Sequence, residues 1–144
     1  MHQNKNMAVN FKEFHRGFTL MELMIVVVIM GIIAAFSIPN YSKAVERSYE
    51  RDGAVNLMAI YASQKIHYNS ENTYVTGKDI ASLNSALELG LIANGMKYAC
   101  NASSVNFDCT ATRGNETFVL KVNKDTSNPC CAAGDCPTIS RCGS

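Results

Sequence analysis

The chain has 144 residues, and its 13 lysine and arginine residues nearly balance 12 aspartate and glutamate residues, so its formal net charge at pH 7 is +1. This length allows one small globular head, and so small a charge gives no support to nucleic-acid binding. The sequence contains neither a glycine-rich phosphate loop nor a paired-carboxylate motif, so we expect no enzymatic activity and no cofactor.

The first predicted element is an apolar helix over Phe18–Ile38. This run has 21 residues, and Glu22 is its only charged side chain. About 20 apolar residues are enough for a helix to cross a bilayer core. A carboxylate at mid-membrane costs roughly 2.5–3.5 kcal/mol on insertion scales, and less near a helix end, where Glu22 lies. An acid in such a segment therefore predicts a functional role and a partner for its carboxylate.

Charges that precede the apolar run predict the orientation of this helix in a membrane. Residues 1–17 hold three basic side chains and one acidic side chain, namely Lys5, Lys12, Arg16 and Glu13. Basic residues that flank a first span stay in the cytoplasm, so residues after Pro39 should lie outside it. Two other interpretations stay open: a secretory signal peptide cleaved after Ala35, and an uncleaved membrane anchor. Glu22 within the run argues against the signal peptide.

The apolar run opens with the hexapeptide Gly17-Phe18-Thr19-Leu20-Met21-Glu22. This hexapeptide resembles the cleavage and methylation site of type IV prepilins and type II secretion pseudopilins. The resemblance implies that a prepilin peptidase cuts after Gly17 and that the new N-terminal Phe18 is N-methylated. Glu22 matches the glutamate that the family retains, and we expect its carboxylate to pair with the Phe18 α-amine of an adjacent subunit. The leader would be residues 1–17, or shorter if translation starts at Met7.

The helical pattern continues to about residue 70, with interruptions at Gly31 and Pro39. Pro39 removes the hydrogen bond that its amide would donate to Ala35. In the resembled family, the helix between an equivalent glycine and proline loosens within assembled filaments, which implies an assembly role for both residues. The alternative is a modest kink in a membrane helix. The expected division of the chain is a leader over 1–17, a transmembrane and assembly helix over 18–39, and a globular pilin head over 40–144.

Beyond the proline, the predicted helix has two stretches of different character. Residues 46–52 carry mixed charges and are expected to form a solvated turn and a half, with charges that pair crosswise or with neighbouring subunits. Gly53 is expected to be a flexible point. Ala54–Ala62 is almost entirely apolar, so a sheet should cover one of its faces and neighbouring subunits another. His67 is expected at a surface or an interface.

A second, shorter helix and three strands are predicted in the remainder. Leucine and isoleucine residues at spacings of three and four predict a helix over Ile80–Leu91, capped by Gly90 or Gly95. Runs typical of strands cover Lys97–Ala102, Val105–Thr112 and Thr117–Asn123. The sheet that they form should lie on the long helix. Residues 124–144 are expected to form a loop that needs covalent crosslinks.

All the cysteines lie in the last third of the chain, as Cys100, Cys109, Cys130, Cys131, Cys136 and Cys142. An even number of cysteines in a small extracytoplasmic domain predicts disulfides. A metal site is the less favoured alternative, because the spacing fits no zinc module. Cys100 should pair with Cys109 across a hairpin, and the other four should pair among themselves. A bond between adjacent cysteines is not expected, because neighbouring residues do not easily meet disulfide geometry.

The C-terminal region distinguishes the two branches of the resembled family. Major pseudopilins typically have an acidic calcium loop that contains tryptophan, whereas this chain has no tryptophan. Its candidate oxygen ligands follow no calcium-loop pattern: Asn123, Asp125, Asn128 and Asp135. This departure favours a pilus subunit over a secretion pseudopilin. Two matches to the N-glycosylation sequon, at Asn101 and Asn115, are too short to predict modification.

The combined prediction is an α+β fold, in which a long N-terminal helix packs on a small antiparallel sheet followed by a disulfide-rich C-terminal loop. The resemblance implies a structural subunit of a type IV pilus filament that polymerises through its N-terminal helix. One alternative is a type II secretion pseudopilin. A membrane-anchored, cysteine-rich binding or redox module is an alternative from another class.

The resemblance also implies partners and a location. The expected partners are further copies of the chain and related pilins in a helical filament, the prepilin peptidase, and assembly machinery of the inner membrane. Before assembly, the chain should cross the inner membrane once, with its N-terminus in the cytoplasm and its head outside. After assembly, it should lie in a pilus at the cell surface.

Overall fold

The computed structural model describes residues 17–114 and 116–143. The elements in chain order are α1 (Leu20–Glu71), α2 (Ile80–Leu87), β1 (Met96–Ala102), β2 (Phe107–Arg113), β3 (Phe118–Asn123) and β4 (Thr126–Gly134). The predicted leader, apart from Gly17, lies outside the described residues, as do the alternative start at Met7 and the sequon residue Asn115. The predicted α+β fold, with one long helix and a small antiparallel sheet, is confirmed.

Helix α1 has 52 residues and matches the predicted long helix closely. Its backbone stays helical through Gly31 and Pro39, so neither residue ends the helix. The chain nevertheless forms two compact units, and the boundary between them lies between Ile38 and Pro39. The unit after this boundary, called the head below, holds the second part of α1 and all the other elements.

Both helices end at a residue in the left-handed backbone conformation, and neither residue is glycine. Asn72 follows α1 with φ 56°, and its N–H donates to the Tyr68 carbonyl at 2.9 Å. Glu88 caps α2 with φ 53°, so the prediction that Gly90 or Gly95 caps this helix is wrong. The predicted helix is accordingly too long, and α2 stops at Leu87.

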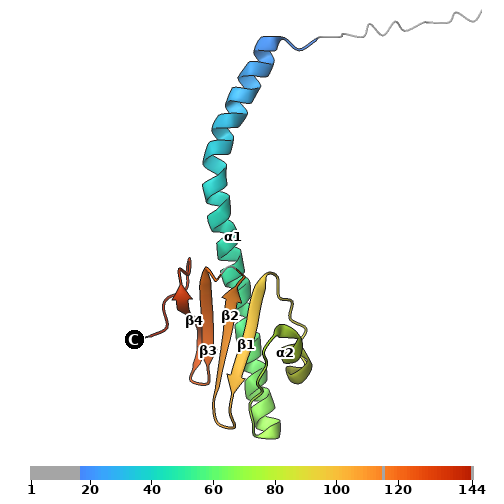
Figure 1. The fold of residues 1–144 in the computed structure, drawn as a ribbon, viewed down its shortest axis with the longest axis vertical. Coiled ribbons are helices and arrows are strands. Elements are labelled where there is room, and N and C mark those ends of the chain that lie inside the picture. The colour runs from blue at the N-terminus through green and yellow to red at the C-terminus, as the bar shows by residue number, and fades with distance from the viewer. Residues whose placement is uncertain (1–16, 115, 144) are drawn as a thin grey trace, which may run out of the picture. The chain divides into compact units, whose positions relative to one another are not determined.

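Helix α2 begins at a capping box, which is a reciprocal pair of side-chain hydrogen bonds. The Ser82 N–H donates to Asp79 Oδ1 at 2.7 Å, and the Asp79 N–H donates to Ser82 Oγ at 3.2 Å. Hydrogen bonds from the Ser82 backbone and side chain hold the pKa of the Asp79 carboxyl below its usual value. The carboxylate therefore fixes the start of α2, which lies beside β1 in Figure 1.

The sheet has four antiparallel strands in the order β1-β2-β3-β4, so each strand pairs with its neighbours in the sequence (Figure 1). The three predicted strands are present with small shifts of their ends. The prediction that residues 124–144 form only a loop is wrong, because Thr126–Gly134 pairs with β3. The sequence pattern did not predict this strand because it contains Pro129. A proline lacks an N–H donor, but an edge strand such as β4 tolerates it.

The core lies between α1 and one face of the sheet. Helix α1 contributes Ala54, Leu57 and Ile60 to it. Alternate positions along β1, β2 and β3 are buried, as expected for strands with one face on a core. The sheet and α2 contribute Leu83, Leu87, Met96, Tyr98, Cys100, Phe107, Cys109, Ala111, Phe118, Leu120 and Val122. Figure 1 shows α1 running behind the sheet.

Gly53 is a packing position and not the predicted flexible point. It is buried within the continuous helix α1. A Cβ atom at this position would lie 2.8 Å from Met96 Cε and 3.4 Å from Leu120 Cδ1. The missing side chain therefore lets α1 approach the sheet closely.

Two polar side chains of α1 form hydrogen bonds to other parts of the head, one to backbone and one to a tyrosine hydroxyl. The buried Gln64 amide donates to the Val75 carbonyl at 2.6 Å and accepts from the Val75 N–H at 2.8 Å. Asn56 donates to the Tyr98 hydroxyl at 2.8 Å. Burial raises the pKa of Tyr98. These contacts join residues far apart in the sequence, so no local pattern predicts them.

Candidate functional site: the helix start and the head surface

The first candidate site is the start of α1, where Thr19 and Glu22 form a second capping box. Glu22 Oε2 accepts hydrogen bonds from the Thr19 N–H at 2.8 Å and from Thr19 Oγ1 at 3.0 Å. The Glu22 N–H donates to Thr19 Oγ1 at 3.2 Å. The helix therefore begins at Leu20, immediately after its cap.

Gly17 and Phe18, the two residues on either side of the expected cleavage point, precede the helix. Their backbone is not helical. A Cβ atom at Gly17 would meet no atom within 4 Å, and the Phe18 side chain is 82% exposed. A peptide bond outside regular structure needs no unwinding before a peptidase binds it, so this geometry suits cleavage. Sequence reasoning overlooked Thr19, although the Thr-x-x-Glu spacing is the usual signal of a capping box.

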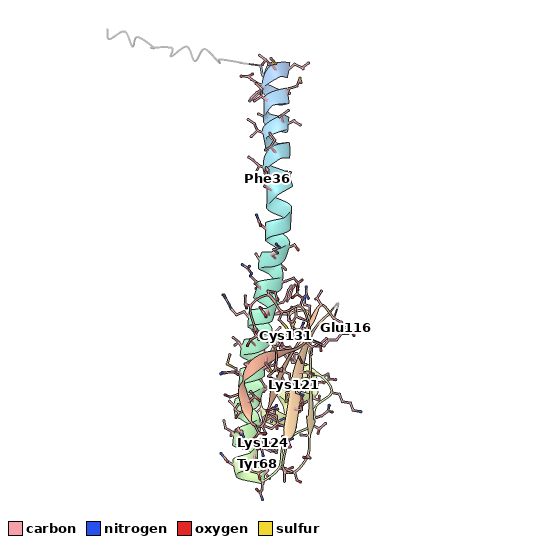
Figure 2. All side chains as sticks on the ribbon, turned by 90° about the vertical axis from the view of Figure 1, so that its left-hand side faces the viewer. Phe36, Tyr68, Glu116, Lys121, Lys124 and Cys131 are labelled. Atoms are coloured by element: carbon pink, nitrogen blue, oxygen red, sulfur yellow. A yellow bond between two sulfur atoms is a disulfide. The ribbon has the colours of Figure 1, made fainter. Side chains whose placement is uncertain are left out.

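The first part of α1 is apolar and exposed. It contains an 18-residue window with a mean hydropathy of 2.6, none of which is buried. By length and composition, this helix is suited to cross a membrane. Figure 2 shows side chains projecting to several sides of this part of α1, where Phe36 is labelled. Gly31 lies within it, and a Cβ there would meet nothing within 4 Å. Packing within the single chain therefore gives no reason for this glycine.

The second part of α1 has one buried face and one exposed apolar face. Val55, Met58 and Ile66 follow each other at helical spacing, and their exposed fractions are 56%, 43% and 68%. The expectation that Ala54–Ala62 is covered on one face by the sheet is met, while the other face is open in the single chain.

The prediction that residues 46–52 form a solvated turn is wrong for the two glutamates. Glu46 pairs with Arg113 of β2, whose Nε lies 3.4 Å from Glu46 Oε2. The Arg113 guanidinium also lies 3.3 Å from the centre of the Tyr49 ring. Helix α1 is thus fixed to the sheet by an ion pair and by a cation–π contact. Glu46 therefore has its partner in the sheet, not on its own helix.

Glu50 is fully buried, although it is an acid in the predicted solvated stretch. Its carboxylate accepts hydrogen bonds from the Thr138 N–H at 2.8 Å, from Thr138 Oγ1 at 2.6 Å and from the Ile139 N–H at 2.8 Å. Hydrogen bonds to an ionised acceptor are stronger than neutral ones, and here they offset the cost of burying the charge. Glu50 thereby attaches the C-terminal segment to α1.

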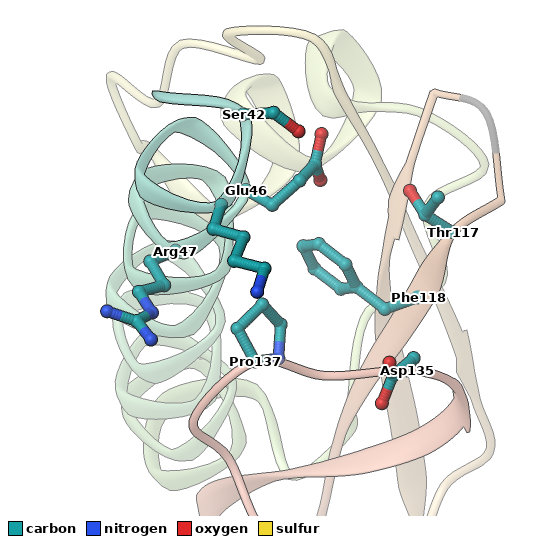
Figure 3. Close-up of a pocket in the computed structure, with 8 residues that line it drawn as sticks. Ser42, Glu46, Arg47, Thr117, Phe118, Asp135 and Pro137 are labelled. Atoms are coloured by element: carbon teal, nitrogen blue, oxygen red, sulfur yellow. The ribbon is translucent and has the colours of Figure 1, made fainter. Parts of the chain in front are cut away.

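A pocket of about 420 Å³ lies where α1, the start of β3 and the C-terminal segment meet (Figure 3). Phe118 and Pro137 give it an apolar wall, and Lys43 and Asp135 also line it. Figure 3 shows the Phe118 ring directed into the pocket and the Arg47 side chain directed away from Phe118.

The six cysteines form three disulfides: Cys100–Cys109, Cys130–Cys142 and Cys131–Cys136. The first joins β1 to β2 between directly opposed residues, as expected for a hairpin. The other two lie within the last part of the chain, and adjacent cysteines are not bonded to each other. Within the part of the chain that the structure describes, no group of three or more histidine, cysteine, aspartate or glutamate side chains is placed to hold a metal ion.

Comparison with known proteins places the apolar helix start in a family. The family model described as the prokaryotic N-terminal methylation motif matches residues 14–38. A fimbrial protein of Dichelobacter nodosus is 33% identical over 114 residues, which cover 78% of this chain and 67% of that protein. The chain belongs to the type IV pilin family.

Other type IV pilins match different lengths of the chain. The type IV major pilin protein PilA of Myxococcus xanthus is 39% identical over 100 residues, or 69% of this chain and 42% of that protein. The type IV major fimbrial protein FimA of Dichelobacter nodosus is 55% identical over 42 residues, or 29% of this chain and 26% of that protein. The chain thus spans less than half of the length of the Myxococcus pilin.

Proposed function

We propose that the chain is a structural subunit of a type IV pilus filament and not an enzyme. The observation that carries this proposal is the start of α1, where an accessible Gly17–Phe18 bond precedes a capped, exposed apolar helix. The family model covers the same segment. The relatives named type IV major pilin and fimbrial protein support the same role.

Processing is the first step of the proposed function. A prepilin peptidase cuts after Gly17 on the cytoplasmic side of the inner membrane and releases the leader, residues 1–17. The new N-terminal Phe18 is then N-methylated. The apolar helix stays in the membrane with the head outside the cytoplasm until assembly. The non-helical backbone at Gly17 and Phe18 supports cleavage at this bond.

Assembly through α1 is the second step, and it covers the apolar surfaces that the single chain leaves open. The first part of α1 leaves the lipid when the filament forms, so neighbouring subunits must replace the lipid around it. Gly31 has no packing role within the chain, and small residues let helices approach each other closely. Val55, Met58 and Ile66 offer a second apolar face to neighbouring subunits.

Glu22 changes its partner in this sequence of events. Before cleavage, its carboxylate accepts hydrogen bonds from Thr19, which lowers the cost of an acid in the apolar segment. Cleavage creates a positively charged α-amine at Phe18. In the filament, Glu22 pairs with the Phe18 amine of an adjacent subunit and fixes the axial position of the two copies. Such a buried pair mainly specifies how neighbouring subunits align and adds little net stability.

The C-terminal segment supports a pilus subunit over a secretion pseudopilin. Asn123, one of the candidate calcium ligands, uses its Oδ1 atom for the turn between β3 and β4, where it accepts from Asp125 N and Thr126 N. The last residues are held by β4, by two disulfides and by Glu50. Hydrogen bonds and disulfides therefore hold the C-terminal segment in place, whereas a bound calcium ion would do so in a secretion pseudopilin.

The test is mass spectrometry of filaments sheared from cells that express the full chain. The proposed function predicts this chain in the sheared fraction, with N-methyl-Phe18 as its first residue. Cells lacking the gene are the control for the identity of the filament. A first residue at Phe36 would support the signal-peptide alternative. An intact leader, with the chain wholly in the membrane fraction, would support an anchored module.

A further inference from the structure

Three exposed basic side chains follow one another along α1 near the start of the head, and the first of them, Lys43, also lines the pocket of Figure 3. Lys43, Arg47 and Arg51 follow at intervals of four residues, so they lie along one ridge of the helix. All three are exposed, and no ion pair holds any of them within the described part of the chain. We call these three residues the basic ridge.

The neighbouring acids do not neutralise the basic ridge, because they are engaged by other parts of the head. The same stretch of sequence holds Glu46 and Glu50, which would neutralise the cations if they shared their surface. Glu46 instead faces Arg113, and Glu50 is buried against the C-terminal segment. This stretch therefore exposes more positive than negative charge, because Lys43, Arg47 and Arg51 are exposed, whereas Glu46 and Asp52 are only partly exposed and Glu50 is buried.

A groove of opposite charge lies at the other end of the head. It has a volume of about 600 Å³ and runs between the last turns of α1 and the end of α2. Glu71 and Glu88 line it and are exposed. His67, Ser70 and Thr73 are among its other lining residues, and the described residues that line it include no lysine or arginine. We call it the acidic groove.

The basic ridge and the acidic groove cannot meet within one molecule. Lys43 and Glu71 are both on α1, and 28 residues of helix separate them by about 42 Å. Complementary surfaces at opposite ends of one molecule pair only between copies. Such head-to-tail contacts do not close on themselves when the copies follow a helical path, so they extend into a filament.

We propose that the basic ridge of one copy docks on the acidic groove of a second copy of this chain. Arg47 then lies opposite Glu71 or Glu88, and the contacting copies are offset by about 36 Å along α1, which is the length of helix between residues 47 and 71. This inference rests on the proposed function, because it names a contact between heads in the filament. It adds a polar, directional contact to the apolar packing of the helix starts.

Charge exchange between the two surfaces tests the proposal. Arg47→Glu and Glu71→Arg, each alone, should lower the yield of sheared filaments roughly tenfold or more, because like charges then face each other. The double variant should recover most of the wild-type yield. Lys97→Glu is the matched control, since Lys97 is an exposed cation of β1 outside both surfaces. Each variant is first checked for a mature N-terminus, which separates assembly from processing.

A second measurement avoids substitutions altogether. Wild-type filaments are treated with a zero-length carbodiimide crosslinker, which joins only lysines and carboxylates in contact. Peptides that join Lys43 to Glu71 or Glu88 arise only between copies, given the separation of about 42 Å within one chain. Such peptides support the docking, and crosslinks from Lys43 that never involve these two glutamates overturn it.

Other outcomes overturn the proposal in distinguishable ways. Normal filaments from both single variants would show that the surfaces do not touch. If the double variant stays defective and Arg47→Glu weakens binding of the full chain to vesicles rich in phosphatidylglycerol, the ridge faces lipid and not a second copy. If wild-type chain is absent from sheared filaments, the proposed function fails first, and the docking fails with it.

Discussion

Two glutamates on α1 show how the surroundings decide what a carboxylate does. Glu22 lies at the exposed start of the helix and accepts two hydrogen bonds from Thr19. Glu50 has no exposed surface and accepts from Thr138 and Ile139 of the C-terminal segment. Neither forms an ion pair with another of the described residues. The first is available to an incoming partner, whereas the second is fully used within the head.

Replacement of Glu22 should separate membrane insertion from assembly. In Glu22→Val, the apolar segment becomes more hydrophobic, so insertion should be unchanged or better. Filament yield should fall severely, because the Phe18 α-amine of the neighbouring subunit loses its counter-charge in an apolar setting. Cell fractionation measures insertion, and electron microscopy of sheared material measures filaments.

Glu22→Gln is the matched control for this experiment. It keeps an oxygen acceptor for the Thr19 N–H at the helix start but removes the charge. If charge pairing is the function, Gln should behave like Val. Normal filaments from Glu22→Val would contradict the proposed role outright.

Replacement of Glu50 should destabilise the head. In Glu50→Ala, three donors lose their acceptor and a cavity forms, so the free energy of unfolding should fall by about 3 kcal/mol. Denaturant titration of the full chain in detergent measures this change. Glu46→Ala is the comparison, because its half-exposed ion pair with Arg113 should contribute about 1 kcal/mol or less. An equal decrease in the free energy of unfolding in the two variants would show that the buried Glu50 carboxylate contributes no more than the half-exposed ion pair.

At the scale of elements, β4 and the segment after it depend on one glycine. Gly134 ends β4 with φ 79°, a conformation that side chains disfavour. A Cβ atom there would lie 2.2 Å from the Thr117 carbonyl oxygen, which belongs to backbone that cannot easily move. The position therefore requires glycine on two independent grounds.

Gly134→Ala should lower the free energy of unfolding by about 2 kcal/mol or more, because strain in the backbone and a steric clash act together. Gly90→Ala is the control, since a Cβ at Gly90 would meet nothing within 4 Å and its φ is not in the left-handed range. It should change stability by less than about 0.5 kcal/mol. Thermal unfolding of both variants in the same detergent makes the comparison. A tolerated alanine at position 134 would mean that the end of β4 is not built as described.

At the scale of the whole molecule, the disulfides crosslink only one part of the chain. All three lie between Cys100 and Cys142, in the sheet and the segment that follows it. Helix α1 and helix α2 carry none. The disulfides therefore do not attach α1 to the sheet, and this attachment depends on packing and on polar contacts such as Glu46 with Arg113 and Asn56 with Tyr98.

Burial predicts the order in which the disulfides open under a mild reductant. Cys130 and Cys142 are half-buried, whereas Cys100 and Cys109 are almost completely buried in the core. Alkylation and peptide mapping should therefore find Cys130 and Cys142 labelled first, and Cys100 and Cys109 last. The unfolded chain, in which all the cysteines are exposed, is the control. Early labelling of Cys100 in the folded protein would contradict the core position of the first bridge.

The sequence predicted what depends on local pattern and missed what depends on distant partners. The long helix, three strands and the pairing of Cys100 with Cys109 follow from hydrophobic spacing and from a short turn. The burial of Glu50 could not be predicted, because its donors lie 88 and 89 residues away. Strand β4 was not predicted, because its proline and its two adjacent cysteines interrupt the alternation of apolar and polar residues that is typical of a strand. The Thr19 cap was readable from its spacing but was overlooked.

The absence of disulfides from α1 has a mechanical consequence for a filament built as proposed. When such a filament is pulled, tension passes from subunit to subunit along the packed α1 helices, and the sheet is carried on them as a side load. The polar contacts that resist sliding of the sheet along α1 are then Glu46 with Arg113 and Asn56 with Tyr98, and Glu50 holds the segment after β4 through Thr138. These lie at intervals along the helix, so they share a shearing force instead of breaking one after another. The sheet can thus stay attached to α1 under load while its disulfides remain unstressed.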